Sequence, residues 1–246
     1  MKNNFFYQKS LANIHAKPNT NSEVISQILY GESFKILGKK KEWIKIKTNY
    51  DNYIGYIKYL NFPKIFKPSF KIYKQKAKIF QKIKGKFKPT KNFLYFATKI
   101  PFKNSNNSFI EFDKNRWIKK KDVKKEDYYE RNSNKIFKLF LNSKYLWGGK
   151  TANGIDCSAL VQLYFYFNNV FFPRDTKDQI KFIKKTKNPK LYIKDKLLYW
   201  KGHVAICLNK SLLIHAYGPK KKVVIMRINK TIKEIKKNAK LNLKKI

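Results

Sequence analysis

The sequence predicts an α+β fold in which short β-strands fill the first half and a buried helix lies in the second half. Short apolar runs separated by turn residues occupy the N-terminal part, and one apolar run of helical length follows a glycine-rich loop further on. The length of 246 residues allows one large domain or two to three small ones. An apolar content of 43% excludes a disordered chain, and no uncharged apolar stretch is long enough to predict a transmembrane helix.

Residues 1–61 are expected to form a small barrel of short strands. Turn residues, a glycine and lysines separate the strand-like runs, which are residues 11–16, 24–30, 34–37, 43–47 and 53–59. In WIKIK, polar and apolar residues partly alternate, as on a half-buried strand. The order of ANIHAKPN, YGESFKIL, EWIKIK and DNYIGYI resembles a bacterial SH3-like domain.

Residues 62–127 are expected to form a second, degenerate SH3-like barrel. AKIFQKIKGKF, LYFATKIPF, SFIEF and RWIKKKDV read as strands, and the segments NSNNS and FDKN read as turns. A single barrel followed by a strand-rich linker is the alternative. The polar stretch KKKDVKKEDYYERNSNK predicts the boundary with a domain of residues 128–246, which begins with a helix near residues 136–141.

The formal net charge of +42 raises the question of an anionic partner. Only four of the 57 basic residues are arginine, whereas dedicated nucleic-acid surfaces usually use arginine for bidentate contacts. The composition therefore favours a solvated lysine-rich surface over a polyanion-binding one, and no specific nucleic-acid partner is expected. In either case the positive field accelerates the approach of anionic ligands.

A candidate nucleophile lies where a flexible loop meets the long apolar run. The loop contains Gly148 and Gly149, Asp156 is positioned to cap the following helix, and Cys157 falls in its first turn. Unpaired backbone N–H groups and the helix dipole stabilise a thiolate there, so the cysteine pKa is predicted to lie below its ordinary value of ~8.5. Cys207 lies on an apolar strand and is predicted to be a buried core thiol; free thiols are favoured over one disulfide.

Two histidines are candidates for the base that accepts the Cys157 proton and for the group that orients this base. His203 begins the strand-like run HVAICL, and His215 lies in LLIHAYG after a short NKS turn. Neighbouring antiparallel strands bring such imidazoles together, so that one accepts the cysteine proton and the other fixes its ring. Two core histidines bonded to backbone groups are the alternative, and His15 is predicted to be a surface residue. The spacings form neither CxxC nor HExxH, so no metal and no other cofactor are expected.

GIDCSALV, FPRDTKDQ, GHVAICL and IHAYG follow one another in an order and spacing that resemble the NlpC-type cell-wall cysteine peptidases, over about residues 135–230. The resemblance implies a papain-like peptidase domain with Cys157 as nucleophile, His203 as base and His215 as the orienting residue. It implies acyl transfer through a thioester. The family usually has glycine where this chain has Ala159, and the added methyl group is not expected to change the mechanism.

The preceding SH3-like domains make the chain similar to γ-D-glutamyl-diamino-acid endopeptidases, which act on murein peptides with a free N-terminal L-Ala. This resemblance implies that Asp156 and Tyr145 bind the substrate amine. The other positions that line the substrate site in that subgroup correspond to Trp147, Ser158, Arg174 and Thr176.

The same resemblance implies that the first barrel contributes an acidic residue and a tyrosine, for which Glu32 and Tyr53 are the candidates. A buried ammonium requires such anionic and hydroxyl partners. Arg174 is expected to pair with an anionic group of the substrate, and the alternative is that it ties its own loop together.

The N-terminus lacks the basic start, the apolar run and the cleavage site of a secretory signal. A cytoplasmic cysteine-type endopeptidase or dipeptidyl peptidase that recycles soluble murein peptides is therefore expected. One alternative is a wall hydrolase, exported by a route that the sequence does not reveal, whose barrels bind the wall. The non-enzymatic alternative is a basic polyanion-binding module with an inactive peptidase fold.

Overall fold

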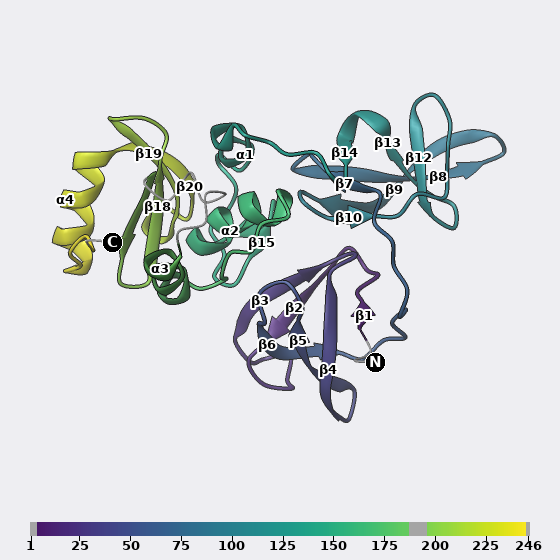
Figure 1. The fold of residues 1–246 in the computed structure, drawn as a ribbon, viewed down its shortest axis with the longest axis horizontal. Coiled ribbons are helices and arrows are strands. Elements are labelled where there is room, and N and C mark those ends of the chain that lie inside the picture. The colour runs from purple at the N-terminus through teal and green to yellow at the C-terminus, as the bar shows by residue number, and fades with distance from the viewer. Residues whose placement is uncertain (1–3, 187–195, 245–246) are drawn as a thin grey trace. The chain divides into compact units, whose positions relative to one another are not determined.

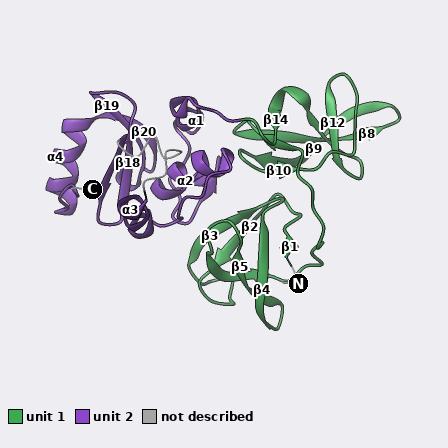
Figure 2. Cartoon of the chain, in the orientation of Figure 1, with its two compact units in different colours: residues 1–128 green, residues 129–246 purple. Residues whose placement is uncertain are grey.

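The computed structural model describes residues 4–186 and 196–244. The chain divides into two compact units, residues 1–128 and residues 129–246 (Figure 2). Unit 1 is built from β-strands with one short 3-10 turn, and unit 2 combines an antiparallel sheet with α-helices (Figure 1). The α+β class expected from the sequence is therefore confirmed. The boundary between the units lies one residue after the predicted start of the third domain.

The first part of unit 1 is an antiparallel sheet in the order β1-β4-β5-β6-β2-β3. Its strands are β1 (Phe5–Phe6), β2 (Leu11–His15), β3 (Val24–Leu29), β4 (Ser33–Lys40), β5 (Trp43–Thr48) and β6 (Ile54–Lys58). All predicted strands are present, and β1 is an addition that pairs with β4. Their inward side chains, among them Ile14, Ile28 and Ile46, form a buried apolar core.

His15 lies inside this sheet rather than on the surface. Its side chain is 8% exposed, its Nδ1 is 3.2 Å from the carbonyl oxygen of Ser22, and its ring meets the edge of Trp43. The prediction of a surface residue was wrong because a lone histidine in a strand gives no sign of which face it occupies.

The second part of unit 1 has a separate core. Its strands are β7 (Phe70–Ile72), β8 (Lys76–Ile83), β9 (Lys86–Tyr95), β10 (Lys99–Ile100), β11 (Asn104–Ser105), β12 (Phe109–Asp113), β13 (Arg116–Lys119) and β14 (Val123–Lys125), with the 3-10 turn η1 (Lys120–Asp122) before the last. They form one sheet in the order β11-β12-β13-β8-β9 and another in the order β10-β7-β14. Buried residues such as Ile79, Leu94 and Phe112 fill the space between them. The assignment of residues 62–127 to a second SH3-like domain stays a prediction.

Tyr30 joins the two cores of unit 1. It directly follows β3 of the first sheet, yet it is 1% exposed and belongs to the second core. Its ring meets the edges of Phe66 and Phe112, and the guanidinium of Arg116 lies 5.4 Å from its centroid. Gly31 permits this approach, because a Cβ there would lie 2.5 Å from the carbonyl oxygen of Lys99 and its φ is +78°.

Unit 2 contains an antiparallel sheet in the order β17-β18-β19-β20. The elements in chain order are α1 (Ser133–Leu139), β15 (Lys150–Thr151), β16 (Gly154–Ile155), α2 (Cys157–Phe167), α3 (Thr176–Lys185), β17 (Leu197–Trp200), β18 (His203–Cys207), β19 (Leu212–Tyr217), η4 (Gly218–Lys220), β20 (Lys222–Arg227) and α4 (Ile228–Ala239). Helix α2 packs against β18 and β19, and α4 packs against β20. This arrangement brings the start of α2 next to the start of β18.

Helix α2 is the centre of unit 2. Every one of its residues is buried, which agrees with a sequence that is apolar on most sides. Asp156 caps it with an extended backbone, and its side chain accepts the N–H of Ala159 at 2.8 Å. The helix ends at Phe167, Asn168 is its C-cap, and Asn169 follows with a left-handed φ of 56°. The predicted start of the helix at Cys157 is confirmed.

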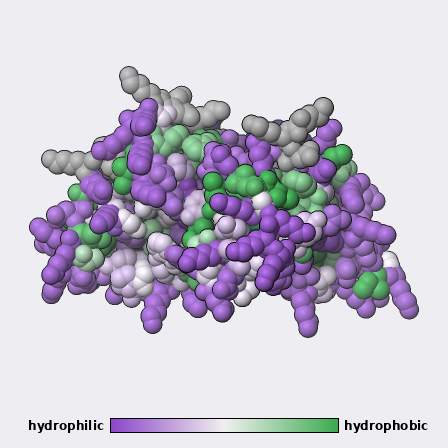
Figure 3. All heavy atoms as spheres, turned by 90° about the horizontal axis from the view of Figure 1, so that it is seen from below, coloured by the Kyte–Doolittle hydropathy of each residue, from purple (hydrophilic) through white to green (hydrophobic). Residues whose placement is uncertain are grey.

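The surface seen in Figure 3 is mostly hydrophilic. Hydrophilic side chains spread over most of the face visible in Figure 3, with smaller apolar areas between them. No helix in the described ranges is long and apolar enough to cross a membrane.

Candidate active site

Cys157 lies at the buried tip of α2, against the first residues of β18. The residue is 4% exposed. Its thiol is 4.0 Å from the carbonyl oxygen of Gly202, and the backbone N–H of Val204 donates a hydrogen bond to the sulfur. Gly202 and Val204 flank His203, so the fold brings the predicted nucleophile to the strand end that carries the predicted base. No direct hydrogen bond joins the described side chains of Cys157 and His203, and such bonds often tighten only when substrate is bound.

The two predicted histidines form a pair. Nε2 of His203 lies 2.9 Å from Nδ1 of His215. His215 is completely buried, and the ring of Tyr217 stacks on it with 4.5 Å between centroids. Within the described chain, Nδ1 of His203 has no hydrogen-bond partner, so this nitrogen is left to exchange a proton. The alternative of two core histidines bonded to backbone groups does not fit this geometry.

The protonation of the site differs from the sequence-based expectation. Burial, and after it the negative charge of Asp156, raise the pKa of the Cys157 thiol to about 12, against smaller lowering effects from backbone hydrogen bonds and Arg174. Burial lowers the pKa of His203 to about 4 and that of His215 to about 3. The prediction of a lowered cysteine pKa was therefore wrong, because desolvation outweighs the helix terminus. The site without substrate holds a neutral thiol and two neutral imidazoles.

A buried ion pair supports the loop before α2. The guanidinium of Arg174 lies 2.6 Å from Oδ2 and 3.0 Å from Oδ1 of Asp156, and their side chains are 2% and 7% exposed. Arg174 also donates to the hydroxyl of Ser158 at 2.8 Å and to the carbonyl oxygen of Gly149 at 3.5 Å. The structure therefore favours the alternative for Arg174, in which it ties its own loop to the helix, over pairing with the substrate.

Asp156 and Ser158 belong to the same network. Oδ1 of Asp156 also accepts the Ser158 hydroxyl and the N–H of Ala159, and Oδ2 also accepts the N–H of Gly148. Both carboxylate oxygens thus have several protein donors. This geometry supports a positioning role for Asp156 and Ser158, and their contact with a substrate stays a prediction.

Among the predicted substrate-binding residues, Tyr145 lies near the Cys157 sulfur and has a hydroxyl group that is available for a hydrogen bond. Its side chain is half-buried. Burial, and to a smaller extent the nearby Cys157 and Asp156, raise the pKa of its hydroxyl to about 12. Its hydroxyl has no hydrogen-bond partner among the described residues. Trp147 is 58% exposed on the same loop, and Thr176 is half-buried at the start of α3. Substrate contacts of these side chains stay predictions.

Glu32 and Tyr53 lie in unit 1, where each is bonded to the first barrel. Glu32 is 6% exposed and accepts the N–H of Leu29 at 3.2 Å. The hydroxyl of Tyr53 donates to the carbonyl oxygen of Ile25 at 3.2 Å. Their part in substrate binding stays a prediction.

Two supporting residues were missed as site residues. Buried Gln179 donates to the carbonyl oxygens of Ser158 and Pro173 and accepts the Tyr199 hydroxyl at 3.1 Å. Its place in the motif FPRDTKDQ was a signal that could have found it. Met226 lies with its sulfur 3.3 Å from Nε2 of His215, and no motif marks it.

Both cysteines are free, as expected. Cys207 is half-buried, rather than fully buried as predicted, and burial raises its pKa. Among the described residues no group of His, Cys, Asp and Glu is arranged to hold a metal ion.

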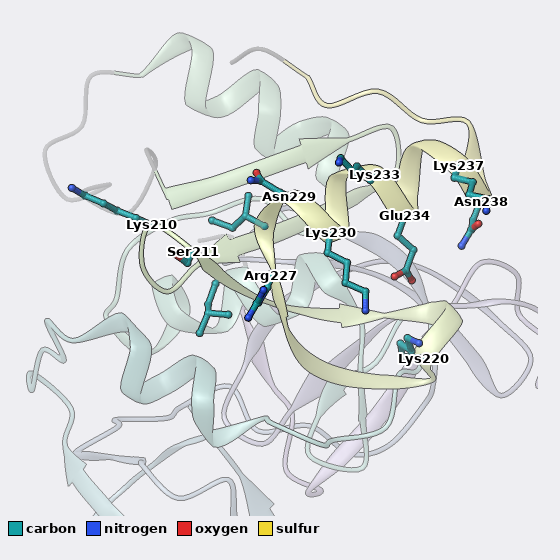
Figure 4. Close-up of a pocket in the computed structure, with 12 residues that line it drawn as sticks. Lys210, Ser211, Lys220, Arg227, Asn229, Lys230, Lys233, Glu234, Lys237 and Asn238 are labelled. Atoms are coloured by element: carbon teal, nitrogen blue, oxygen red, sulfur yellow. The ribbon is translucent and has the colours of Figure 1, made fainter.

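A separate groove of about 1200 Å³ lies between α4 and the ends of β19 and β20 (Figure 4). Figure 4 shows Lys230 and Glu234 extending from α4 into it. Among the described residues, Glu234 is its one acidic lining residue, and its basic lining residues are Lys210, Lys220, Arg227, Lys230, Lys233 and Lys237. None of the predicted catalytic residues lines this groove.

Comparisons with known proteins agree with this architecture. Residues 142–239 match the NlpC/P60 family, and residues 10–61 match the bacterial SH3 domain. The chain thus combines a bacterial SH3 domain with an NlpC/P60 domain, and the family match together with the names of the relatives below supports a peptidase, a hydrolase.

Two relatives match most of the chain. The chain is 25% identical to dipeptidyl-peptidase 6 of Lysinibacillus sphaericus, and the match covers 84% of each protein. It is 23% identical to the γ-D-glutamyl-L-lysine dipeptidyl-peptidase of Bacillus subtilis (strain 168), with 87% of this chain and 79% of the relative covered.

Solved structures share the fold. An NlpC/P60 family protein from Bacillus cereus ATCC 10987 superposes with a TM-score of 0.76 at 17% identity, over 92% of this chain and 94% of that one. An NlpC/P60 endopeptidase from Photobacterium damselae subsp. piscicida gives a TM-score of 0.61 at 13% identity, over 99% of this chain and 70% of that one.

Proposed function

We propose that the chain is a cysteine peptidase that hydrolyses the γ-D-glutamyl-diamino-acid bond of murein peptides with a free N-terminal L-Ala. The observation that carries the proposal is the position of Cys157. Its sulfur lies at the start of a buried helix, against the backbone that flanks His203, while His215 holds the other side of the His203 ring. The name of the Bacillus subtilis relative, a γ-D-glutamyl-L-lysine dipeptidyl-peptidase, supports the choice of bond, and the name of the other relative supports a dipeptidyl-peptidase.

The proposed reaction begins with attack of the Cys157 sulfur on the γ-D-glutamyl carbonyl carbon. Because the thiol is neutral at rest, its proton passes to Nδ1 of His203 as the carbon–sulfur bond forms. The tetrahedral intermediate then collapses, the carbon–nitrogen bond breaks, and His203 gives the proton to the leaving amine. A thioester remains on Cys157.

Water completes the cycle. His203 takes a proton from the water as its oxygen attacks the thioester, and the proton then returns to the sulfur as the acyl group leaves. The developing oxyanion needs donors. The backbone N–H of Cys157 suits this role because it belongs to the first residue of α2 and has no partner within the helix.

The test compares L-Ala-γ-D-Glu-diaminopimelate with its N-acetylated form. We expect cleavage of the first peptide and marked loss with the second, because acetylation removes the amine charge. Cys157→Ala should abolish cleavage and leave the fold intact, and Cys207→Ala serves as the matched thiol control that retains it. Equal turnover of both peptides would refute recognition of the free amine, and turnover by the Cys157→Ala protein would refute the nucleophile.

A second candidate function, binding of an anionic polymer, is favoured by the basic groove of Figure 4. Six cationic side chains around one concave surface match a row of phosphates better than scattered lysines do. This function predicts that polyphosphate binds with an affinity that falls steeply with salt. It also predicts that Cys157→Ala has no effect on binding.

A charge-matched comparison separates this groove from the general positive charge. The groove variant carries Lys230→Glu, Lys233→Glu and Lys237→Glu, and the control carries Lys86→Glu, Lys88→Glu and Lys91→Glu on exposed positions of unit 1. Both lose the same formal charge. If the groove binds polyphosphate, only the first variant loses affinity and shows a flatter salt dependence. Equal losses in both would refute a site in the groove.

A further inference from the structure

The sulfur of Met226 contacts the outer nitrogen of the histidine pair. Sδ of Met226 is 3.3 Å from Nε2 of His215, while Nδ1 of the same ring faces His203 at 2.9 Å. The strand register explains the contact. β19 and β20 pair Leu213 with Met226 and His215 with Val224, so Met226 and His215 are diagonal neighbours on one face of the sheet. Long side chains reach each other across such a diagonal.

A thioether can only accept a hydrogen bond, and this property determines where the protons lie. Nε2 of His215 must carry its hydrogen in order to donate to Met226. The Nδ1 atom of a neutral His215 is then a lone pair, so it accepts the Nε2–H of His203. A neutral His203 that carries hydrogen on Nε2 has none on Nδ1. All hydrogen bonds of the pair therefore run in one direction and end at Met226.

The reverse arrangement would disable the base. If Nδ1–H of His215 donated to Nε2 of His203, the proton of His203 would move to Nδ1, the nitrogen that must accept the cysteine proton. In that arrangement the lone pair of His215 Nε2 would face the lone pairs of the Met226 sulfur. Tyr217 stacks on His215 and constrains the plane of the ring, but stacking does not distinguish the two tautomers.

We propose that Met226 is a positioning residue that fixes the tautomers of His215 and His203 and thereby keeps Nδ1 of His203 free to accept a proton. This inference rests on the proposed cysteine-peptidase function. It assigns Met226 no contact with the substrate, and its side chain acts on the reaction through the two imidazoles.

The composition of the chain permits an isosteric test. It contains two methionines, Met1 and Met226, so growth of a methionine auxotroph on norleucine changes one internal side chain. Norleucine keeps the length and shape of methionine and replaces the sulfur by a methylene group, which accepts no hydrogen bond. Selenomethionine keeps the acceptor and serves as the matched control. A Met226→Leu protein provides a genetic counterpart.

The first measurement is the nitrogen-15 spectrum of the histidine rings, which distinguishes the two tautomers directly. The normal and selenomethionine proteins should show hydrogen on Nε2 of both His203 and His215. The norleucine protein should show a mixture of tautomers at both rings. An unchanged spectrum in the norleucine protein would overturn the inference, whether or not any peptide is cleaved.

The second measurement is steady-state cleavage of L-Ala-γ-D-Glu-diaminopimelate. In the norleucine protein kcat should fall in proportion to the fraction of His203 that carries hydrogen on Nδ1, about twofold for an even mixture and at most the ~10²–10⁴-fold that a general base contributes, while KM stays constant. The selenomethionine protein should match the normal one. A norleucine protein with unchanged kcat would overturn the inference. Failure of the normal protein to cleave the peptide would instead overturn the proposed function, and the ring spectrum would still decide the role of Met226.

Discussion

Arg174 and Asp156 form a bidentate ion pair that is almost completely removed from water. The distances from the guanidinium nitrogens to the two carboxylate oxygens are 2.6 and 3.0 Å. The pair joins the segment before α3 to the cap of α2, and Ser158 and Gly149 add further hydrogen bonds to it. It therefore holds the residue before Cys157 in place, and its removal should be felt by both stability and activity.

Arg174→Ala should destabilise the protein by about 3–5 kcal/mol, because it leaves a buried carboxylate without its counter-charge. The free energy of unfolding in urea measures this loss. Lys58→Ala is the control, since Lys58 and Glu42 form an ion pair at 3.5 Å with side chains 55% and 64% exposed. That change should cost less than about 1 kcal/mol. Equal costs for the two variants would contradict the structural role of Arg174.

The rate at which iodoacetamide modifies Cys157 should rise continuously with pH in the substrate-free protein. Burial raises the pKa of this thiol to about 12, so the reactive thiolate fraction keeps increasing through the neutral and alkaline range. Mass spectrometry of the modified peptide at several pH values measures the rate. A rate that is already constant between about pH 5 and 8 would show a preformed thiolate, and the neutral resting state would be refuted.

The histidine pair should make the folded state sensitive to acid. Burial lowers the pKa of His203 to about 4 and that of His215 to about 3, below the ordinary value of ~6.5 that both have when unfolded. The unfolded chain thus binds more protons than the folded one below pH ~6.5, so stability falls as the pH decreases from there toward 4.

Unfolding in urea between pH 7 and 4 tests this linkage. A variant with His203→Asn and His215→Asn should lose part of the pH dependence, because neither amide titrates. The difference between the two proteins removes the contribution of all other groups. If both proteins show the same slope across this range, the two histidines do not have lowered pKa values.

Tyr145→Phe should weaken the binding of the free-amine peptide. The change removes a hydroxyl that has no partner in the described part of the chain, so the fold should remain unaffected. KM for L-Ala-γ-D-Glu-diaminopimelate should rise several-fold, by the ~0.5–1.5 kcal/mol of one hydrogen bond, and kcat should change little. The N-acetylated peptide should show no such rise. An equal effect on both peptides would rule out a contact between this hydroxyl and the amine.

Local signals in the sequence predicted much of the fold. Turn residues located the strands of the first barrel, and the sequence Asp156-Cys157 before an apolar run located the start of α2. The approach of His203 and His215 also followed from local information, because a short turn joins their strands. These features depend on residues that are close together in the sequence.

The properties that were not predicted depend on distant parts of the chain. The raised pKa of Cys157 reflects burial by several elements, which no helix-terminus argument contains. The ion pair between Arg174 and Asp156 joins two residues that are 18 positions apart in the sequence. The contact of Met226 with His215 depends on the register of β19 and β20, since a shift by one residue would turn the sulfur to the other face.

Tyr30 has a consequence for how this chain can be divided. Its side chain starts from the first sheet of unit 1 and fills the interior of the second part, against Phe66 and Phe112. A fragment that starts after residue 61 would lack this ring and open a hole the size of a tyrosine in its own interior. The two parts of unit 1 therefore depend on each other, and any truncation or graft must carry residues 1–128 together.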